Sequence, residues 1–202
     1  MPLRYIAVAL RYIAVVLLFA LCGAVSAWFL VPAARIDKPA PLFPFPFIIL
    51  CALLCLPLRR RSIGTIGLMI GSIILMFVTW GIAQGLASIV PPLGGPFRPF
   101  IMPCVVGGFI GGLGLFLSAS ICYPRFLLLQ YLSGCLGGVL LGSVSGLAFV
   151  PWLHDCFDHL YSSASMPLLV QGVAVWQAAV GTYLYAICNY MDKPQPEESR
   201  SA

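Results

Sequence analysis

Hydrophobic residues fill this chain in long runs, and polar residues gather between the runs. A helix needs about 20 mostly apolar residues to cross the hydrocarbon core of a bilayer. Six runs reach or approach that length: residues 12–31, 43–58, 63–90, 100–123, 126–150 and 167–190. The pattern therefore predicts an all-α integral membrane protein, a bundle of about six transmembrane helices that form a single domain over residues 1–190.

Two of the six runs leave alternatives open. Residues 43–58 are short and contain three prolines, so a re-entrant segment is the alternative to the full crossing favoured by the arginines that follow. Residues 12–31 follow a basic flank and contain Val25-Ser26-Ala27, which suits a signal-peptide cleavage site. Because this run continues through Val31, an uncleaved anchor is favoured over a cleaved signal peptide.

The composition and the charge distribution support the same class. Only 8% of the residues are charged and 61% are hydrophobic, whereas a soluble domain carries about 25% charged residues. The net charge of +5 is dispersed and forms no basic face for a nucleic acid. The expected surroundings are therefore the lipid bilayer, with other membrane proteins or copies of the same chain as candidate partners.

Lysine and arginine also predict an orientation. With a cytoplasmic N-terminus, the inner segments hold eight basic residues and the outer loops hold three, a bias that is typical of cytoplasmic loops. Both termini are then cytoplasmic, and residues 191–202 form a disordered cytoplasmic tail. The expected location is a cell membrane, with a bacterial inner membrane favoured. The inner residues are Arg4, Arg11, Arg59, Arg60, Arg61, Arg125, Lys193 and Arg200, and the outer residues are Arg35, Lys38 and Arg98.

Glycines recur along the fourth and fifth runs at helical spacing. Helices in lipid associate by close backbone approach, which rows of small residues permit. We expect these two runs to be antiparallel neighbours that pack through the glycines, and a self-association surface is the alternative interpretation. The predicted packing residues are Gly107 and Gly111 in the fourth run and Gly134, Gly138, Gly142 and Gly146 in the fifth.

A polar stretch follows the fifth run. Residues 151–161 place apolar side chains at i, i+3, i+4 and i+7, which predicts a short amphipathic helix on the outer membrane surface, between the fifth and sixth spans. His154, Asp155, Asp158 and His159 share its opposite face. These residue types bind zinc or copper and titrate with pH, so they form a candidate metal site or pH sensor. The alternative is a solvated polar face.

Catalytic chemistry is not expected. Gly142-Ser143-Val144-Ser145-Gly146 superficially resembles the serine motif of rhomboid intramembrane proteases, but the later run carries no histidine to activate a serine. No phosphate-binding loop, dinucleotide fingerprint or haem attachment sequence occurs. We therefore expect no enzymatic activity and no cofactor.

The remaining polar signal is a buried amide. No aspartate or glutamate lies within the six runs, whereas proton-coupled transporters hold ionisable groups at membrane depth. Gln177 lies nearest the middle of a span and should find hydrogen-bond partners inside the bundle, with contact to a solute as the alternative. The favoured interpretation is a non-enzymatic accessory or structural membrane subunit. A small-solute transporter or channel component is the alternative, and a metal or pH sensor is a more remote one.

Overall fold

The computed structural model describes residues 2–34, 45–56, 63–71, 73–74, 78, 98–121, 128–159 and 166–191. The secondary-structure elements in these described ranges are helices, and no strand occurs among the described residues. The expected all-α class is therefore confirmed. The helices are α1 (Pro2–Ala34), α2 (Phe45–Cys55), α4 (Arg98–Ser120), α5 (Leu128–Gly146), α6 (Val150–His159) and α7 (Met166–Met191).

Four helical stretches are long and apolar enough to cross a membrane: Tyr5–Ala27, Ile101–Ser120, Tyr131–Asp155 and Met166–Asn189. They correspond to the first, fourth, fifth and sixth runs of the sequence. Of the third run, only residues 63–71, 73–74 and 78 are described, and they are helical. The crossing expected for residues 63–90 therefore lies mostly outside the described residues and stays a prediction.

The second run forms a shorter helix than a full crossing requires. α2 has 11 residues, so it is about 16 Å long against roughly 30 Å of hydrocarbon. Pro46 is tolerated in the first turn, where its missing N–H has no helical partner. Pro57 disfavours a helical conformation at the preceding Leu56, which is a bend. The prolines therefore limit the helix, and α2 alone does not make the full crossing expected of residues 43–58.

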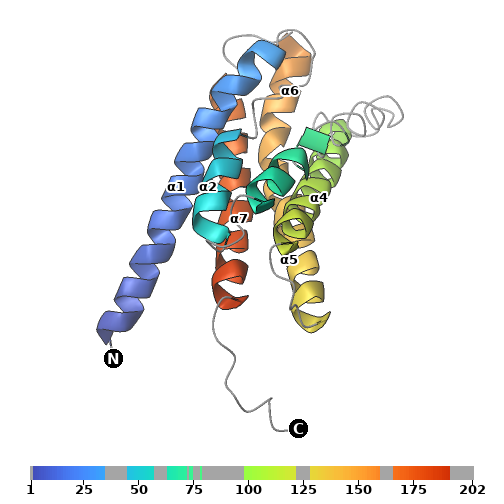
Figure 1. The fold of residues 1–202 in the computed structure, drawn as a ribbon. Coiled ribbons are helices and arrows are strands. Elements are labelled where there is room, and N and C mark those ends of the chain that lie inside the picture. Colours follow the sequence, from blue (N-terminus) through green and yellow to red (C-terminus); the bar gives the residue numbers. More distant parts are fainter. Residues whose placement is uncertain are drawn as a thin grey trace, which may run out of the picture.

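The helices form two antiparallel pairs joined through α7 (Figure 1). α1 packs along α7, α4 packs along α5, and α5 also contacts α7. Arg11 near the start of α1 bonds to Asn189 near the end of α7. The N-terminal end of α1 and the C-terminal end of α7 therefore lie at the same end of the bundle, as Figure 1 shows.

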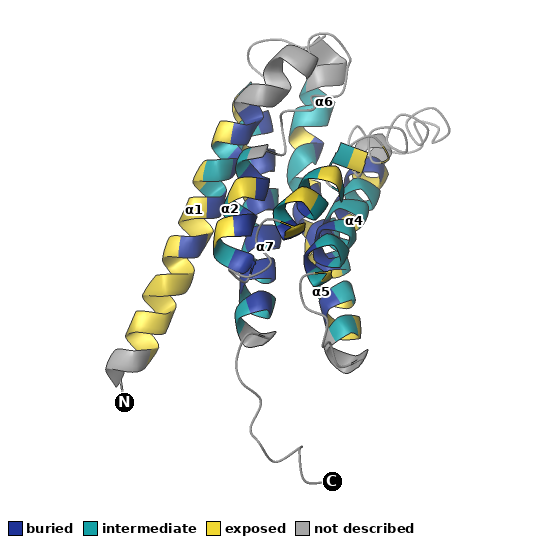
Figure 2. Cartoon of the chain, viewed as in Figure 1, coloured by how far each residue is buried: buried dark blue, intermediate teal, exposed yellow. Residues whose placement is uncertain are grey.

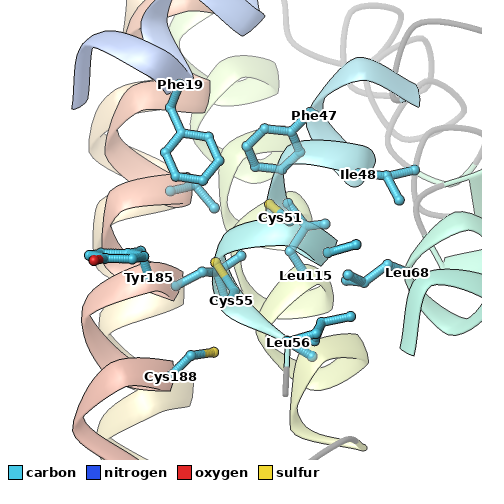
Figure 3. Packing of buried hydrophobic residues seen from close by; sticks show 14 of the residues in the cluster. Phe19, Phe47, Ile48, Cys51, Cys55, Leu56, Leu68, Leu115, Tyr185 and Cys188 are labelled. Atoms are coloured by element: carbon cyan, nitrogen blue, oxygen red, sulfur yellow. The ribbon is translucent and has the colours of Figure 1, made fainter. Parts of the chain in front are cut away.

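α2 fills the space beside the α1–α7 pair. Its Phe47 ring lies 5.6 Å from the Phe19 ring of α1 and 6.0 Å from that of Trp176 in α7. At its other end, the Cys55 thiol contacts that of Cys188. Figure 3 shows this apolar core, to which α4 adds Leu115. α2 therefore runs in the same direction as α7 and packs along its C-terminal half, from Trp176 to Cys188.

The outside of the bundle is apolar. Residues 5 to 14 of α1 are all exposed, and the first buried side chain described in this helix is Val15 (Figure 2). On α5 an exposed stripe repeats every four residues: Leu132, Leu136, Leu140 and Val144. Large contiguous apolar surfaces are rare on soluble monomers. Hydrocarbon is the solvent that suits these exposed faces.

The polar stretch after the fifth run is helical, as expected. It forms as α6, but it follows α5 through a short 3-10 helix, Leu147–Phe149, and continues in the same general direction (Figure 1). The ring of Pro151 would clash with the carbonyl of Leu147 in a regular α-helix, and the tighter turn is consistent with relieving that clash. Trp152 is partly buried and packs against the cluster of Ala27, Leu169 and Val173. α6 contacts α4 and α7. The short helix therefore packs on the bundle, and its place on the outer membrane surface stays a prediction.

Candidate functional site in the helix interfaces

The α4–α5 interface is a direct backbone contact. A Cβ on Gly108 would collide with the carbonyl oxygen of Gly142, and a Cβ on Gly142 would collide with that of Gly108. Gly112 and Gly138 stand in the same reciprocal relation. Gly108 and Gly112 are four residues apart on α4, and Gly138 and Gly142 are four residues apart on α5. Because the helices are antiparallel, these equal intervals bring both pairs into contact at once. No side chain separates the helices at these positions.

The ends of this interface are closed by larger groups. A Cβ on Gly146 would meet the carbonyl oxygen of Cys104, and one on Gly134 would meet the ring of Phe116. All four glycines expected in the fifth run therefore face α4. The facing row on α4 consists of Cys104, Gly108, Gly112 and Phe116.

The α4 glycines that make this contact are not the ones selected from the sequence. Gly108 and Gly112 face α5, whereas Gly111 lies under the ring of Trp176 in α7. Gly107 is half-buried. Neighbouring residues in a helix are about 100° apart, so a glycine doublet opens two faces. The row at 107 and 111 and the row at 108 and 112 have the same spacing, and only the packed structure distinguishes them.

The second faces of the glycine doublets receive aromatic side chains of α7. Trp176 covers Gly111 of α4, and Tyr183 covers Gly137 of α5. The hydroxyl of Tyr183 donates to the carbonyl oxygens of Ser133 at 3.0 Å and Gly134 at 2.9 Å. Because Trp176 and Tyr183 are seven residues apart, they lie on one face of α7 two turns from each other. This face of α7 joins α4 and α5 into one unit.

A second close contact, between α1 and α7, was not predicted from the sequence. A Cβ on Gly23 would lie 2.6 Å from the Cα of Ala174, and one on Gly181 would meet the ring of Phe19. These glycines stand singly in their helices, so no row marks them. The available signal was weaker: each is an isolated glycine within an apolar helix, where a packing reason is common.

The polar centre of the bundle lies in this second interface. Gln177 is 1% exposed and Ser26 is 0% exposed, and the Ser26 hydroxyl donates to Gln177 Oε1 at 3.5 Å. The structure therefore places Gln177 inside the bundle, opposite α1. Ser145 is also buried, and its hydroxyl bonds to carbonyls of its own helix, those of Leu141 and Gly142.

The candidate metal site is described only in part. His154 and Asp155 are half-buried in α6, and the side chains of Asp158 and His159 lie outside the described residues. Among the side chains that the structure describes, no three histidine, cysteine or acidic residues gather as they would around a metal ion. The metal site at these four positions stays an untested prediction.

Comparison with known proteins adds no functional assignment. No protein-family model, no curated protein and no solved structure matches the chain. What the described interfaces can do chemically follows from their contents, which are backbone contacts, aromatic rings and neutral polar groups. Such groups hold helices together or contact a neutral solute.

Proposed function

We propose that this chain is a multi-pass membrane protein that acts as a non-enzymatic accessory or structural subunit. Its proposed location is a cell membrane, with a bacterial inner membrane favoured. The observation that carries the proposal is the use of the buried polar side chains. In the described part of the bundle these are Ser26, Ser145 and Gln177, and each is bonded within the protein. The bond between Ser26 and Gln177 joins α1 to α7, and the bonds of Ser145 stay within α5.

A large apolar surface supports the role of a subunit. Of the four candidate spans, the one in α1 buries the smallest share of its residues, 17%, against 44% for the one in α7. Ile13, Leu17 and Leu21 form an exposed stripe on the side of α1 away from α7. A neighbouring membrane protein that packs on this stripe would cover the least-buried helix of the bundle.

The proposed topology has six crossings and cytoplasmic termini. α2 runs toward the end of the bundle that holds the termini, and Arg59, Arg60 and Arg61 follow it in the sequence. Basic residues are enriched on the cytoplasmic side, so this arrangement agrees with termini on that side. The proposed second crossing is residues 43–58, and the proposed third crossing is residues 63–90.

Reporter fusions test this topology. Fusions after Leu42, Pro96 and Ser163 should report the outer side, and one after Ser62 should report the cytoplasm. If the Ser62 fusion reports the outer side while fusions at both termini report the cytoplasm, α2 belongs to a re-entrant segment. Residues 63–90 then do not cross either, and the count is four. Reports from a single side at every position would contradict the membrane topology altogether.

Mild purification tests the subunit role. The protein purified in a gentle detergent should retain a partner membrane protein in fixed stoichiometry, identified by mass spectrometry. Leu17→Trp on the exposed stripe of α1 should release it, whereas Leu136→Trp on the exposed stripe of α5 serves as the matched control and should retain it. A homogeneous monomer without a partner, obtained under conditions that preserve the fold, would contradict the proposal.

A small-solute transporter or channel component is the second candidate. It is favoured by the length of the Ser26–Gln177 hydrogen bond, 3.5 Å, which is at the outer limit of such bonds. In addition, Thr182 Oγ1 is buried without a hydrogen-bond partner in the described structure. A solute that bound to such groups would stabilise the purified protein against heat in a concentration-dependent way without any partner protein.

A further inference from the structure

Arg11 occupies an unusual position for a charged side chain. It lies within the apolar stretch Tyr5–Ala27, where charge is costly unless it reaches an interface or finds a partner. Two contacts with α7 position its guanidinium. One N–H donates to Asn189 Oδ1 at 3.2 Å, and the group lies 5.2 Å from the centre of the Tyr185 ring. The Tyr12 ring lies 5.8 Å from the same ring at an angle of 80°, so the two rings pack edge to face.

The positioned guanidinium retains hydrogen-bonding capacity. Arginine has five N–H donors, and the bond to Asn189 uses one of them. Arg11 is exposed on the bundle surface, and no carboxylate in the described ranges pairs with it. The remaining donors can therefore reach a group outside the protein. Their planar fork matches the geometry of a phosphate or a carboxylate.

An apolar strip starts beside this cation. Leu18 and Val25 follow Arg11 at intervals of seven residues, so they lie on the same side of α1, and both are exposed. From Arg11 to Val25 the strip is about 21 Å long at 1.5 Å per residue. It runs away from the end of the bundle that holds the termini. Arg4 precedes Arg11 by the same interval in the same helix.

We propose that Arg11 binds the phosphate of an anionic phospholipid whose acyl chain lies along Leu18 and Val25. Charge complementarity and the exposed apolar strip together favour a lipid over a free anion, because a free phosphate would use only the cation. Anionic lipids are abundant in the cytoplasmic leaflet and attract nearby basic residues. The inference rests on the proposed placement of the bundle in a bilayer, with the termini on the cytoplasmic side.

Native mass spectrometry of the purified full-length chain tests the site. The protein in detergent is titrated separately with phosphatidylglycerol, phosphatidylcholine and inorganic phosphate. Phosphatidylglycerol should bind at least several-fold more tightly than phosphatidylcholine. Arg11→Gln should weaken phosphatidylglycerol binding by roughly fivefold, the effect of one basic residue near an anionic surface. Arg98→Gln removes the same charge elsewhere and should leave the binding unchanged.

Two further variants keep the test decisive. Asn189→Ala removes the hydrogen bond that positions the guanidinium and should weaken the binding by a smaller factor. If Arg11→Gln does not fold, Arg11→Lys preserves the charge but loses the planar fork, and it should still reduce the binding of phosphatidylglycerol.

Three outcomes would overturn the proposal. They are equal binding of phosphatidylglycerol and phosphatidylcholine, equal losses in Arg11→Gln and Arg98→Gln, and full competition of the lipid by inorganic phosphate. The last result would assign the cation to a free anion. The lipid titration needs no partner protein. A missing partner would therefore contradict the subunit proposal without affecting the test of lipid binding. Conversely, loss of lipid selectivity with a retained partner would contradict this inference alone.

Discussion

The two antiparallel helix pairs are close-packed in different ways. In the α4–α5 pair, backbone meets backbone at Gly108 with Gly142 and at Gly112 with Gly138. In the α1–α7 pair, one backbone contact at Gly23 is combined with the ring of Phe19 over Gly181 and with a buried polar pair. The first interface has no movable group at its centre, whereas the second contains a side chain that can adopt another rotamer. The difference predicts how each pair tolerates an added methyl group.

Gly112→Ala should have the largest effect. Its Cβ would collide with the carbonyl oxygen of Gly138, so the helices would have to separate. We expect a loss of about 3 kcal/mol or more in the free energy of unfolding, or no folded protein. Denaturant titration in detergent, followed by circular dichroism, measures it. Gly67→Ala is the matched control, because a Cβ there meets nothing within 4 Å, and it should be neutral or slightly stabilising.

Gly181→Ala should have a smaller effect. The added methyl group meets the ring of Phe19, which can move. We expect a loss of about 1–2 kcal/mol in the same titration. The double variant with Phe19→Leu should lose less than the sum of the single variants, because the shorter side chain makes room. Strict additivity would show that the ring is not the obstacle and would weaken the contrast between the two pairs.

Tyr183→Phe should cost about 1 kcal/mol. The variant keeps the ring over Gly137 and removes only the hydrogen bond to the carbonyls of Ser133 and Gly134. The unfolding midpoint in the same detergent reports the loss. A cost as large as that of Gly112→Ala would mean that α7, rather than the glycine contact, holds α4 and α5 together.

Gln177→Leu should have the smallest effect on stability, about 0.5 kcal/mol. Hydrogen bonds between membrane helices contribute little on average, and the freed hydroxyl of Ser26 can turn to a carbonyl of its own helix. Thermal unfolding of the purified variant measures the effect. If the protein is a structural subunit, partner retention should be unchanged. Loss of a measured solute response in a stable variant would favour the transporter alternative.

The glycine contact shows how far sequence reasoning extends. The four-residue spacing of Gly134, Gly138, Gly142 and Gly146 depends only on helix geometry, and the structure places all four against α4. On α4 two rows with equal spacing were available. Which row faces α5 depends on the rotation of α4 about its axis, and that rotation also seats Trp176 over Gly111.

The same division explains α6. The spacing of apolar residues predicted that α6 is a helix, but this pattern does not identify what packs on the apolar face. The prediction assigned that face to the membrane surface. In the structure α6 contacts α4 and α7, and Trp152, at the edge of that face, packs against the cluster that includes Ala27 and Leu169.

For α2, the sequence predicted a short segment, because prolines lie at both of its ends. The sequence did not predict that α2 lies beside α7, because a helix that is apolar on all sides has no face that marks its partner.

The sequence by itself determined that this protein has helices long and apolar enough to cross a membrane. Long runs with few charges suit hydrocarbon, where backbone groups must be bonded within helices. The tertiary structure alone decided which small residues meet, which aromatic rings fill the second faces of the glycine doublets, and where Arg11 is held. Those contacts join residues as distant in the chain as Arg11 and Asn189. Helical periodicity ranks positions around one helix, whereas the rotation and pairing of helices depend on all of their surfaces together.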